Sequence, residues 1–450
     1  MIVFGSLSWL ALAGVLGVEL KAPTSLDITR IALTIAGGIG ATVALVVAYR
    51  RQRDLEANRF TERFGAAAAQ LGDIDPAVRL AGVYAMATVA DDTSNLPWRK
   101  QCVDVLCAYL RTPFDPTISS PNLVERTLTR TGPGNYPIET AELHRFRYHD
   151  TEVRKTVVRV IADHLHRDAK PSWSSVALDL TGATLPYADF SNCVFGADAV
   201  FTRVTFFGSA RFDGAHFTQR SFFDFAEFKG HATFGQIFST DGPLTYFDGS
   251  AFFHGAKFHG QVQWARVRFR GHTQFSGMLL VDSGSRCEFH ASVTFIDVEF
   301  SDQAQFHGVR FGSDLAMSDT TFHKSAQFTP TQGPFSHPVS FERDVELYDV
   351  KFSSLTSFSK AVFTGDAYLG DVEYRGRVNF KEAHFHGNTS FENAQFHRTA
   401  DFRGCNFVGS TTFRSPLKWG NVITDWDDDI NRKPDTVSPA YWPPPVASIN

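Results

Sequence analysis

The sequence predicts a mainly β protein, in which short strands wind into a four-sided coil and helices come first. The leading observation is the stretch VNFKEAHFHGNTSFENAQFHRTADFRGCNFVGSTTF at 378–413, where the steps between phenylalanines alternate between five and six residues. Helices have a side-chain period of 3.6 and strands a period of 2, so neither explains this spacing. A fixed longer period indicates stacked repeats. Composition supports this reading, because 43 of the 450 residues are phenylalanine.

Each phenylalanine of this stretch follows a small residue by two positions, as Phe385 follows Ala383. Residues two apart share one face of a strand, so each pair turns inward and the polar residues between pairs form corners. Two steps cover eleven residues, so a four-sided coil needs about 22, and Phe358, Phe380 and Phe402 should stack. The predicted core of this stretch comprises Phe380, Phe385, Phe391, Phe396, Phe402, Phe407, Ala383, Ala394 and Cys405.

The large–small pattern begins near Leu185, and it predicts repeats over 177–414. Three interruptions, at about 239–246, 276–286 and 329–338, predict loops that either carry a function or are tolerated insertions. After the repeats, residues 415–450 are predicted to form a cap followed by a disordered, proline-rich tail.

Two apolar runs, 2–18 and 31–48, open the chain. Each approaches the ~17–25 residues that a membrane-spanning helix needs, so together they predict a transmembrane helical hairpin over 1–50. Two alternatives stay open: a secretory signal peptide followed by one span, and buried helices of a soluble domain. The residues after the second run are basic, namely Arg50, Arg51, Arg53 and Arg59. The positive-inside rule then predicts a two-pass membrane protein with its repeats in the cytoplasm and the lipid bilayer as one partner.

The region between the apolar runs and the repeats has a helical pattern. Residues 51–114 predict a small α-helical module, in which Pro76 marks a helix start and Pro113 marks a stop. Residues 115–150 are rich in proline, threonine and glycine and predict a loop or linker. Residues 151–176 predict a further helix that leads into the repeats.

Several segments of this region carry a resemblance to a known family. RFTERFGAAAAQLG, DPAVRLAGVYAMATVADD and VDVLCAYLRTP, followed by IADHL and the repeats, resemble a bacterial family of membrane-anchored pentapeptide-repeat proteins in sequence and in order. The resemblance implies that the repeats form a right-handed quadrilateral β-helix. The six-residue steps depart from the strict advance of five in that family. The resemblance also implies a protein of the bacterial cytoplasmic membrane.

Charge and motifs exclude several classes of function. The chain has 43 basic and 48 acidic residues and a formal net charge of −5, which does not fit a strongly basic nucleic-acid binder. Its five cysteines lack the paired spacing of a disulfide framework or a zinc module. The sequence contains no phosphate-binding loop, dinucleotide fingerprint or nucleophile elbow. We therefore expect no catalytic, cofactor-binding or metal-binding residues, no cofactor, and no nucleic-acid partner.

Three groups of polar residues remain within the repeats. The histidines of the recurring FHG triplets, and the acidic residues between 342 and 349, predict corners and a solvated face. Arg266, Arg268 and Arg270 alternate along RVRFR, so they should share one face of a strand. These three arginines are the predicted surface contact for a small anion or a partner.

Three functions compete. The first is a non-enzymatic, membrane-tethered scaffold whose rigid repeat rod binds an unidentified cytoplasmic or membrane protein. The second is a DNA mimic that binds and inhibits type II topoisomerases, as some pentapeptide-repeat proteins do. Residues 171–413 carry only 25 acidic and 19 basic residues, whereas DNA has one charge per about 1.7 Å. The third is an enzyme of unrecognised type. An interior packed with phenylalanine offers no obvious cleft, which favours the scaffold.

Overall fold

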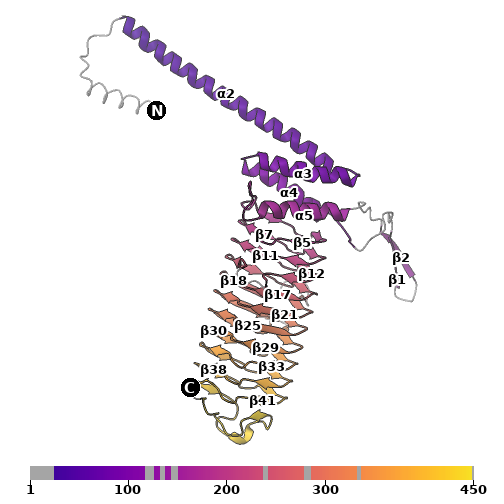
Figure 1. The fold of residues 1–450 in the computed structure, drawn as a ribbon, viewed down its shortest axis with the longest axis vertical. Helices are drawn as coiled ribbons and strands as arrows, with labels where there is room; N and C mark the ends of the chain where they lie inside the picture. Colours follow the sequence, from indigo (N-terminus) through magenta and orange to yellow (C-terminus); the bar gives the residue numbers. More distant parts are fainter. Residues whose placement is uncertain are drawn as a thin grey trace, which may run out of the picture. The chain divides into compact units, whose positions relative to one another are not determined.

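The computed structural model describes residues 25–116, 126–131, 137–142, 150–236, 242–277, 285–331 and 336–447. The chain divides into two compact units, Met1–Gly65 and Ala66–Asn450. The first unit contains most of one long helix. The second contains a helical module and the repeats, which form a stacked coil (Figure 1).

The helix of the first unit, α2, runs without interruption from Ser25 to Leu71 and includes the apolar run 31–48. In the part of the chain that the structure describes, no helix is long and apolar enough to cross a membrane. The predicted two-pass membrane localisation is therefore wrong, and the transmembrane hairpin predicted at 1–50 is not supported by the described helices. The run has 18 residues and is soon followed by Arg50 and Arg51, so it is slightly shorter than the about 20 apolar residues that a span needs. The run at 2–18 lies outside the described residues.

The helical module consists of α3 (Pro76–Asp92), α4 (Leu96–Arg111) and α5 (Asp150–Leu165). Asp75 and Asn95 precede α3 and α4, and their side chains accept hydrogen bonds from backbone N–H groups of the first turn. The predicted linker between α4 and α5 contains a two-stranded antiparallel sheet, formed by β1 (Arg126–Thr131) and β2 (Pro137–Glu142).

A buried ionic cluster joins the three helices of the module. Arg154 on α5 donates from Nε to Asp150 Oδ2 at 2.6 Å, and the two side chains are only 1% and 3% exposed. Arg79 on α3 lies 3.6 Å from the other oxygen of Asp150, and Tyr109 on α4 donates its hydroxyl to that oxygen. Arg154 also donates to the carbonyl of Leu110 at 2.8 Å. Buried charges of this kind tolerate the loss of a partner poorly, because the remaining charge is left desolvated.

The repeats form four parallel sheets, one on each side of the coil, as a four-sided β-helix requires. We number the sheets in the order in which the chain visits them. Sheet 1 consists of β3 (Leu178–Asp179), β7 (Ala199–Val200), β11 (Ser221–Phe222), β15 (Ala251–Phe252), β19 (Thr273–Ser276), β23 (Ala304–His307), β27 (Ala326–Gln327), β31 (Thr356–Ser357), β35 (Val378–Asn379), β39 (Ala400–Asp401) and β43 (Val422–Ile423). Sheet 2 consists of β4 (Thr184–Leu185), β8 (Thr205–Phe206), β12 (Glu227–Phe228), β16 (Lys257–Phe258), β20 (Glu288–Phe289), β24 (Arg310–Phe311), β28 (Ser340–Phe341), β32 (Val362–Phe363), β36 (His384–Phe385) and β40 (Asn406–Phe407).

The other two sheets close the coil. Sheet 3 consists of β5 (Ala188–Asp189), β9 (Ala210–Arg211), β13 (Ala232–Thr233), β17 (Val262–Ala265), β21 (Val293–Ile296), β25 (Leu315–Ser318), β29 (Val345–Tyr348), β33 (Ala367–Tyr368), β37 (Thr389–Ser390), β41 (Thr411–Thr412) and β44 (Val437–Ser438). Sheet 4 consists of β6 (Val194–Phe195), β10 (His216–Phe217), β14 (Thr245–Phe247), β18 (Val267–Phe269), β22 (Glu299–Phe300), β26 (Thr321–Phe322), β30 (Lys351–Phe352), β34 (Glu373–Tyr374), β38 (Gln395–Phe396) and β42 (Lys418–Trp419).

Aromatic rings fill the axis of the coil. The predicted stack is confirmed, because the ring centroid of Phe380 lies 5.1 Å from that of Phe358 and 4.8 Å from that of Phe402. Along sheet 1 the described stack runs from Phe201 to Phe402 with centroids 4.5–5.1 Å apart. These spacings match the about 4.8 Å between hydrogen-bonded strands, so each ring rests on the ring of the next coil.

The alternation of five- and six-residue steps reflects two kinds of corner. In the five-residue step after Phe380, the N–H of Ala383 donates to the carbonyl of Phe380, and Glu382 has a φ of 58°. A positive φ at this third position defines a type II turn. The six-residue step after Phe385 contains Gly387, where a Cβ would lie only 2.2 Å from the carbonyl oxygen of Gly365 on the neighbouring coil. Only glycine fits so close an approach of two backbones.

One column of the core lacks the continuous ring stack. In sheet 3, Met317, Leu347 and Leu369 occupy the inward positions between Phe295 and Phe391. A void of about 10 Å³ lies beside Met317 and Leu347, which is room for about one water molecule. In sheet 4, Tyr374 occupies a phenylalanine position, and its buried hydroxyl has no hydrogen-bond partner among the described residues. Burial raises the pKa of Tyr374 well above its usual value.

Both ends of the coil are covered. Helices α4 and α5 pack against the strands of the first coil. At the other end, the ring of Trp442 lies 5.3 Å from that of Trp419 and 5.4 Å from that of Phe413. The N–H of Ala447 donates to the carbonyl of Pro416 at 3.0 Å. The cap predicted within 415–450 therefore continues to residue 447, where a disordered tail was expected, because aromatic side chains anchor the proline-rich segment.

Replacing Phe391 with aspartate should destabilise the repeats severely, whereas His386→Ala should change the free energy of unfolding by less than about 0.5 kcal/mol. The Phe391 ring is fully buried and stacks on Phe413 at 4.8 Å, while His386 is exposed. The lost ring costs about 3–5 kcal/mol, and the buried carboxylate adds to this. Chemical denaturation followed by circular dichroism measures both values. Equal denaturation midpoints for the two variants would contradict the inward register.

Tyr374→Phe should stabilise the protein by about 1–3 kcal/mol, because it removes a buried hydroxyl whose desolvation no hydrogen bond offsets. Tyr348→Phe is the matched control, since Tyr348 is 61% exposed and its hydroxyl can bond to water. Denaturant midpoints of the two variants and the wild type make the comparison. A destabilised Tyr374→Phe variant would show that the hydroxyl has a partner in solution.

Asp150→Asn should destabilise the helical module by about 3–5 kcal/mol, because two arginines lose the charge that compensates them in the interior. Asp104→Asn provides the control. Asp104 and Lys100 are also four residues apart at 2.6 Å, but their side chains are 45% and 51% exposed, so that pair contributes at most about 0.5 kcal/mol. Hydrogen exchange of the helix α5 amides would report the difference, and similar protection in both variants would argue against a stabilising cluster.

Candidate functional site

The residues predicted as the repeat core lie inside the coil. All six phenylalanines from Phe380 to Phe407, together with Ala383 and Ala394, are buried, and Cys405 is half-buried. Burial raises the pKa of Cys107, Cys193 and Cys405 to about 12 and that of Cys102 to about 11. A thiol reacts as a nucleophile in its thiolate form, so these cysteines are poor candidates for catalysis.

The three arginines predicted as a surface contact are each engaged with acidic residues of the rod. Arg268 donates to Asp297 at 2.7 Å and lies 3.5 Å from Glu299 on the next coil. Arg266 has a φ of 57° at a corner and lies 4.0 Å from the same Asp297. Arg270 instead bonds Asp248 at 3.0 Å and packs over the ring of Tyr246. The structure therefore does not assemble them into an uncompensated basic patch.

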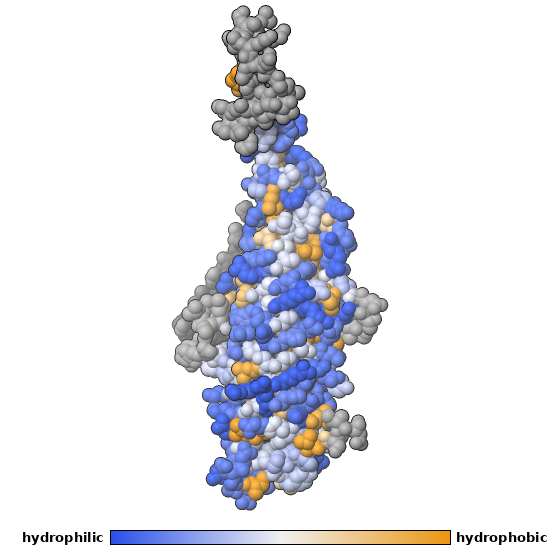
Figure 2. Space-filling view, turned by 90° about the vertical axis from the view of Figure 1, so that its left-hand side faces the viewer, coloured by the Kyte–Doolittle hydropathy of each residue, from blue (hydrophilic) through white to orange (hydrophobic). Residues whose placement is uncertain are grey.

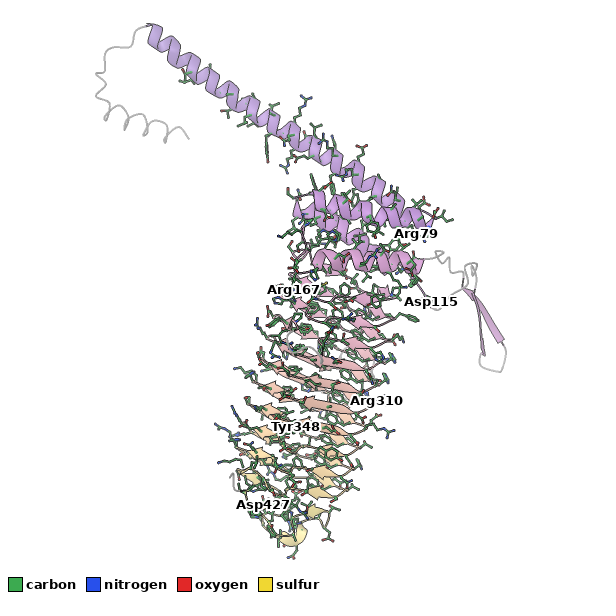
Figure 3. All side chains as sticks on the ribbon, in the orientation of Figure 1. Arg79, Asp115, Arg167, Arg310, Tyr348 and Asp427 are labelled. Carbon is green, nitrogen blue, oxygen red and sulfur yellow. The ribbon has the colours of Figure 1, made fainter. Side chains whose placement is uncertain are left out.

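Ion pairs between neighbouring coils neutralise much of the remaining rod surface. Arg310 (Figure 3) donates to Glu342 at 2.5 and 2.7 Å and lies 3.8 Å from Glu288. The hydrogen bond from Arg310 lowers the pKa of Glu342. The face drawn in Figure 2 is mainly hydrophilic, with small separate hydrophobic spots.

The outer face of sheet 3 differs, because eight of its carboxylates form no ion pair with the described residues. We call this surface the acidic face. It comprises Asp314, Asp319, Asp344, Glu346, Asp349, Asp366, Asp371 and Glu392. Two tyrosines lie among these carboxylates: Tyr348 (Figure 3), which is 61% exposed, and Tyr368, which is 47% exposed. The negative charge of Asp366 is the main cause of a raised pKa at Tyr368.

Part of the acidic face has a structural explanation. The carboxylate of Asp344 accepts a hydrogen bond from the N–H of Asp366 on the next coil, and Asp366 in turn accepts from the N–H of Asn388. Asp349 and Asp371 occupy corners with φ near 50°, a conformation that aspartate tolerates better than most residues. Glu346 neither accepts a hydrogen bond from the next coil nor occupies a corner with positive φ. The sequence reading of 342–349 as a solvated face missed that the carboxylates continue over four coils, because only the register brings them together.

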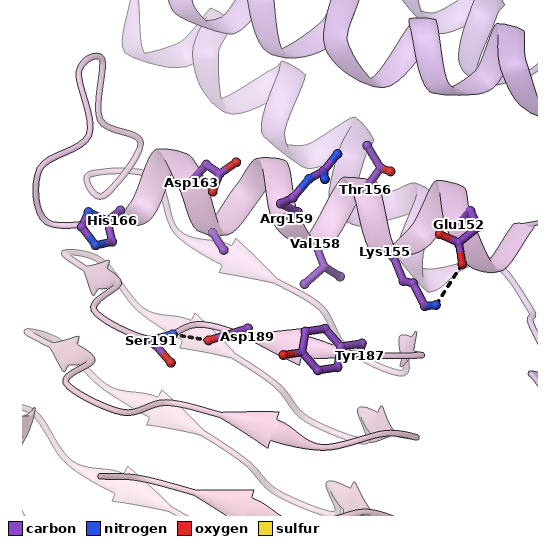
Figure 4. A pocket seen from close by; sticks show the side chains of 11 residues that line it. Glu152, Lys155, Thr156, Val158, Arg159, Asp163, His166, Tyr187, Asp189 and Ser191 are labelled. Atoms are coloured by element: carbon purple, nitrogen blue, oxygen red, sulfur yellow. Dashed lines mark hydrogen bonds and ion pairs between the residues drawn. The ribbon is translucent and has the colours of Figure 1, made fainter. Parts of the chain in front are cut away.

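A groove of about 510 Å³ lies between helix α5 and β5, the edge strand of sheet 3 (Figure 4). Helix α5 contributes Glu152, Lys155, Thr156, Val158, Arg159, Ala162 and Asp163, and His166 directly follows the helix. The strand side contributes Tyr187, Asp189 and Ser191, which alternate along the chain and therefore point to the same side. We call this feature the α5–β5 groove.

Most charges of the α5–β5 groove already have partners. Lys155 lies 2.9 Å from Glu152, and Arg159 donates to the hydroxyl of Tyr84 on α3 at 2.7 Å. Asp189 accepts from Arg211 of the next coil at 3.2 Å and from the N–H of Ser191 at 3.0 Å. Asp163, in contrast, is exposed and forms no ion pair with any residue that the structure describes. Sequence reasoning missed this groove, since α5 reads as an ordinary amphipathic helix.

The histidines of the FHG triplets lie on the outside or at corners of the coil. His254 bonds Asp224 at 2.5 Å and Gln274 at 2.8 Å. Its burial lowers the pKa of this histidine, but the bond to Asp224 outweighs that effect and the pKa is raised overall. Within the described ranges, no group of three or more histidines, cysteines or carboxylates is placed to hold a metal ion.

A family model described as "Pentapeptide repeats (9 copies)" matches residues 375–415, which include β35 to β41 and all nine predicted core residues. Comparison with curated proteins and with solved structures found no match. The family match agrees with the predicted type of repeat, but it does not support a membrane anchor or a bacterial source. Residues 375–415 of this chain are therefore a segment of pentapeptide repeats.

Proposed function

We propose that the protein is a non-enzymatic scaffold whose rigid repeat rod binds a partner protein through its outer surface. The observation that carries this proposal is the packing of the interior. Stacked rings occupy the inward positions of three sheets, and the void beside Met317 and Leu347 measures only about 10 Å³. Groups that bind or react must therefore act from the outside of the rod, where ionisable side chains stay close to water and pKa tuning is weak.

The rod suits recognition of a partner protein because its outward side chains are held at fixed positions relative to one another. Hydrogen bonds between coils set the spacing along the axis, and ring stacking prevents the coils from sliding past one another. A pre-ordered surface loses little conformational entropy on binding, so more of the contact energy appears as affinity. The acidic face is the best candidate for such contact, since a basic partner surface would supply the charges that the rod itself does not.

A second candidate function, mimicry of DNA toward a DNA-binding protein such as a type II topoisomerase, is favoured by the charge density of the acidic face. Eight carboxylates are distributed over four successive coils of sheet 3. At about 4.8 Å per coil, this corresponds to about one charge per 2.4 Å of axis, compared with one per about 1.7 Å in duplex DNA. The density of this face is thus much closer to that of DNA than the average over the whole rod.

Charge reversal tests both candidates. The variant Glu346→Lys/Glu392→Lys alters the acidic face at two residues whose carboxylates form no ion pair with described residues. The control Asp302→Lys/Glu382→Lys makes the same change in net charge elsewhere on the rod. Proteins crosslinked to the wild type should include a partner whose affinity falls about tenfold or more for the first variant but not for the control.

The identity of that partner separates the two candidates. Inhibition of a type II topoisomerase that is lost with Glu346→Lys/Glu392→Lys supports DNA mimicry, whereas a partner that binds no DNA supports the general scaffold. Failure to recover any protein crosslinked to the wild type would contradict both candidate functions. Equal binding to the wild type and both variants would show that the contact lies elsewhere on the rod.

A further inference from the structure

We propose that the outer face of sheet 4 binds the same face of a second copy of the chain, so that two rods lie side by side in the same direction. The inference goes beyond the scaffold function, because it gives the rod a partner that is the protein itself. It depends on opposite charges at the two edges of sheet 4, on the lack of ion-pair partners for these charges among the described residues, and on their common spacing along the rod.

One edge of sheet 4 is acidic. The corner between sheets 3 and 4 carries Asp319, Asp349 and Asp371 in three successive coils. All three are exposed and have φ values of 50–52°, so they occupy equivalent places at the corner. Asp371 accepts one hydrogen bond from Asn393 at 3.1 Å, and none of the three carboxylates forms an ion pair with a described residue. We call these three residues the acidic edge.

The other edge of sheet 4 is basic. The corner between sheets 4 and 1 carries Lys324, Arg377 and Arg398, which follow β26, β34 and β38. All three are exposed, and within the part of the chain that the structure describes none of their side chains forms an ion pair. Glu373 in β34 does not neutralise them, because it lies 2.7 Å from Arg375, which compensates its charge. We call these three residues the basic edge.

The two edges match each other along the rod. They belong to the same four coils, which contain β26, β30, β34 and β38, and hydrogen-bonded strands repeat at about 4.8 Å. A two-fold axis parallel to the rod would place the acidic edge of each copy opposite the basic edge of the other, coil against coil. Asp319 would then face Lys324 of the second copy, and Asp371 would face Arg377. An interface of this kind is self-complementary and closes at two copies.

The same charges determine the direction of the second rod. An antiparallel pair would bring acidic edge against acidic edge and basic edge against basic edge, and like charges repel each other. The centre of sheet 4 favours neither direction, because Lys351 and Glu373 lie there in neighbouring coils and their opposite charges balance. In the parallel pair, Asp349 and Arg398 meet no opposite charge in their own coil, but the next coil of the second copy supplies one. The edges therefore select a parallel pair.

Sheet 2, on the opposite side of the rod, carries charges that are already compensated. Its corner with sheet 1 contains Lys360 and Arg403. Lys360 lies 3.5 Å from Glu382, and Arg403 lies 2.6 Å from Asp401. The basic edge of sheet 4 has no such pairs among the described residues, so sheet 4 is the better face for a second copy.

The contact should be electrostatic and weak. Strands β30 and β38 of sheet 4 lie on the left of the rod in Figure 1, and this side faces the viewer in Figure 2, where the surface is mainly hydrophilic. Four coils extend only about 19 Å along the axis. A small contact between exposed charges predicts a dimer that forms at high protein concentration and dissociates in salt.

The first experiment measures self-association of the purified full-length protein by sedimentation velocity. At low ionic strength the protein should form dimers as its concentration rises, and salt at about 1 M should return it to monomers, because the screening length then falls to about 3 Å. Arg377→Asp and Asp371→Lys should each weaken dimerisation about tenfold or more, since each places like charges opposite each other. Asp371→Lys/Arg377→Asp should restore it, because the exchange re-creates both ion pairs.

Glu382→Lys is the matched control for Asp371→Lys. Glu382 also occupies a corner with a positive φ, 58°, and is exposed, but it lies between sheets 1 and 2. Lys360 has the same φ of 58°, so lysine fits such corners, and circular dichroism should show every variant folded. The control should dimerise like the wild type. A wild type that stays monomeric at low salt, a dimer that high salt leaves intact, an equal loss in the control, or a folded but monomeric Asp371→Lys/Arg377→Asp variant would each overturn the proposal.

The second experiment tests the direction of the rods. Gln395 in β38 lies midway between the two edges, so in a parallel dimer this residue of each copy lies close to the two-fold axis. A short bismaleimide should therefore join Gln395→Cys to the same residue of the second copy, whereas Asn379→Cys on sheet 1 should stay unlinked. Equal crosslinking of the two variants would contradict a contact through sheet 4.

These measurements use the purified chain alone, so they separate this proposal from the scaffold function. A monomeric protein that still loses its crosslinked partner with Glu346→Lys/Glu392→Lys overturns the sheet 4 contact and leaves the scaffold standing. A salt-sensitive dimer that recovers no other protein supports the sheet 4 contact and contradicts the scaffold.

Discussion

The stacking of aromatic rings from one coil to the next is the constraint on which the rest of the protein depends. Phe358, Phe380 and Phe402 repeat at about the spacing of hydrogen-bonded strands, so ring contact and backbone pairing reinforce each other. Strands of two residues cannot hold a sheet together by themselves. The continuous column of rings supplies the buried apolar surface that such short strands lack. Every outward side chain then takes its position from this column.

The corners follow from the same constraint. Coils that touch along their axis bring backbone against backbone, and Gly387 leaves no room for a Cβ at one corner while Glu382 adopts a positive φ at another. Where the ring column is replaced by Met317, Leu347 and Leu369, packing loosens enough to leave a small void. The acidic face crosses this part of the rod, so its charges lie over the least regular stretch of the core.

Sequence reasoning predicted features that depend on neighbours 22 residues apart and failed where contacts are less regular. The small–large pair of Ala383 and Phe385 recurs along the chain, so the four sheets and the stacked rings can be predicted from a local pattern.

The apolar run 31–48 was interpreted from its composition as a membrane span, and composition does not determine where a helix ends or which polar residues extend it. The proline-rich end was expected to be disordered, but Trp442 anchors it. The groove beside α5 arises from the approach of a helix to an edge strand, and no spacing within either segment encodes that approach.

The covered ends give the rod a further property. Helices α4 and α5 pack against strands β3, β4 and β5 of the first coil, and the tryptophan cap covers the last coil, so both ends of the sheets are protected from pairing with a second molecule. Length is then free to vary in whole turns. Removing 22 residues from the middle removes one complete coil and leaves both capped ends and all four sheets in place. Removing eleven residues would instead remove half a coil. The repeats after the deletion would then be rotated by half a turn relative to those before it, and the part of the acidic face that they carry would lie on the opposite side of the rod. In such a protein, insertions and deletions act as rotations as well as changes of length.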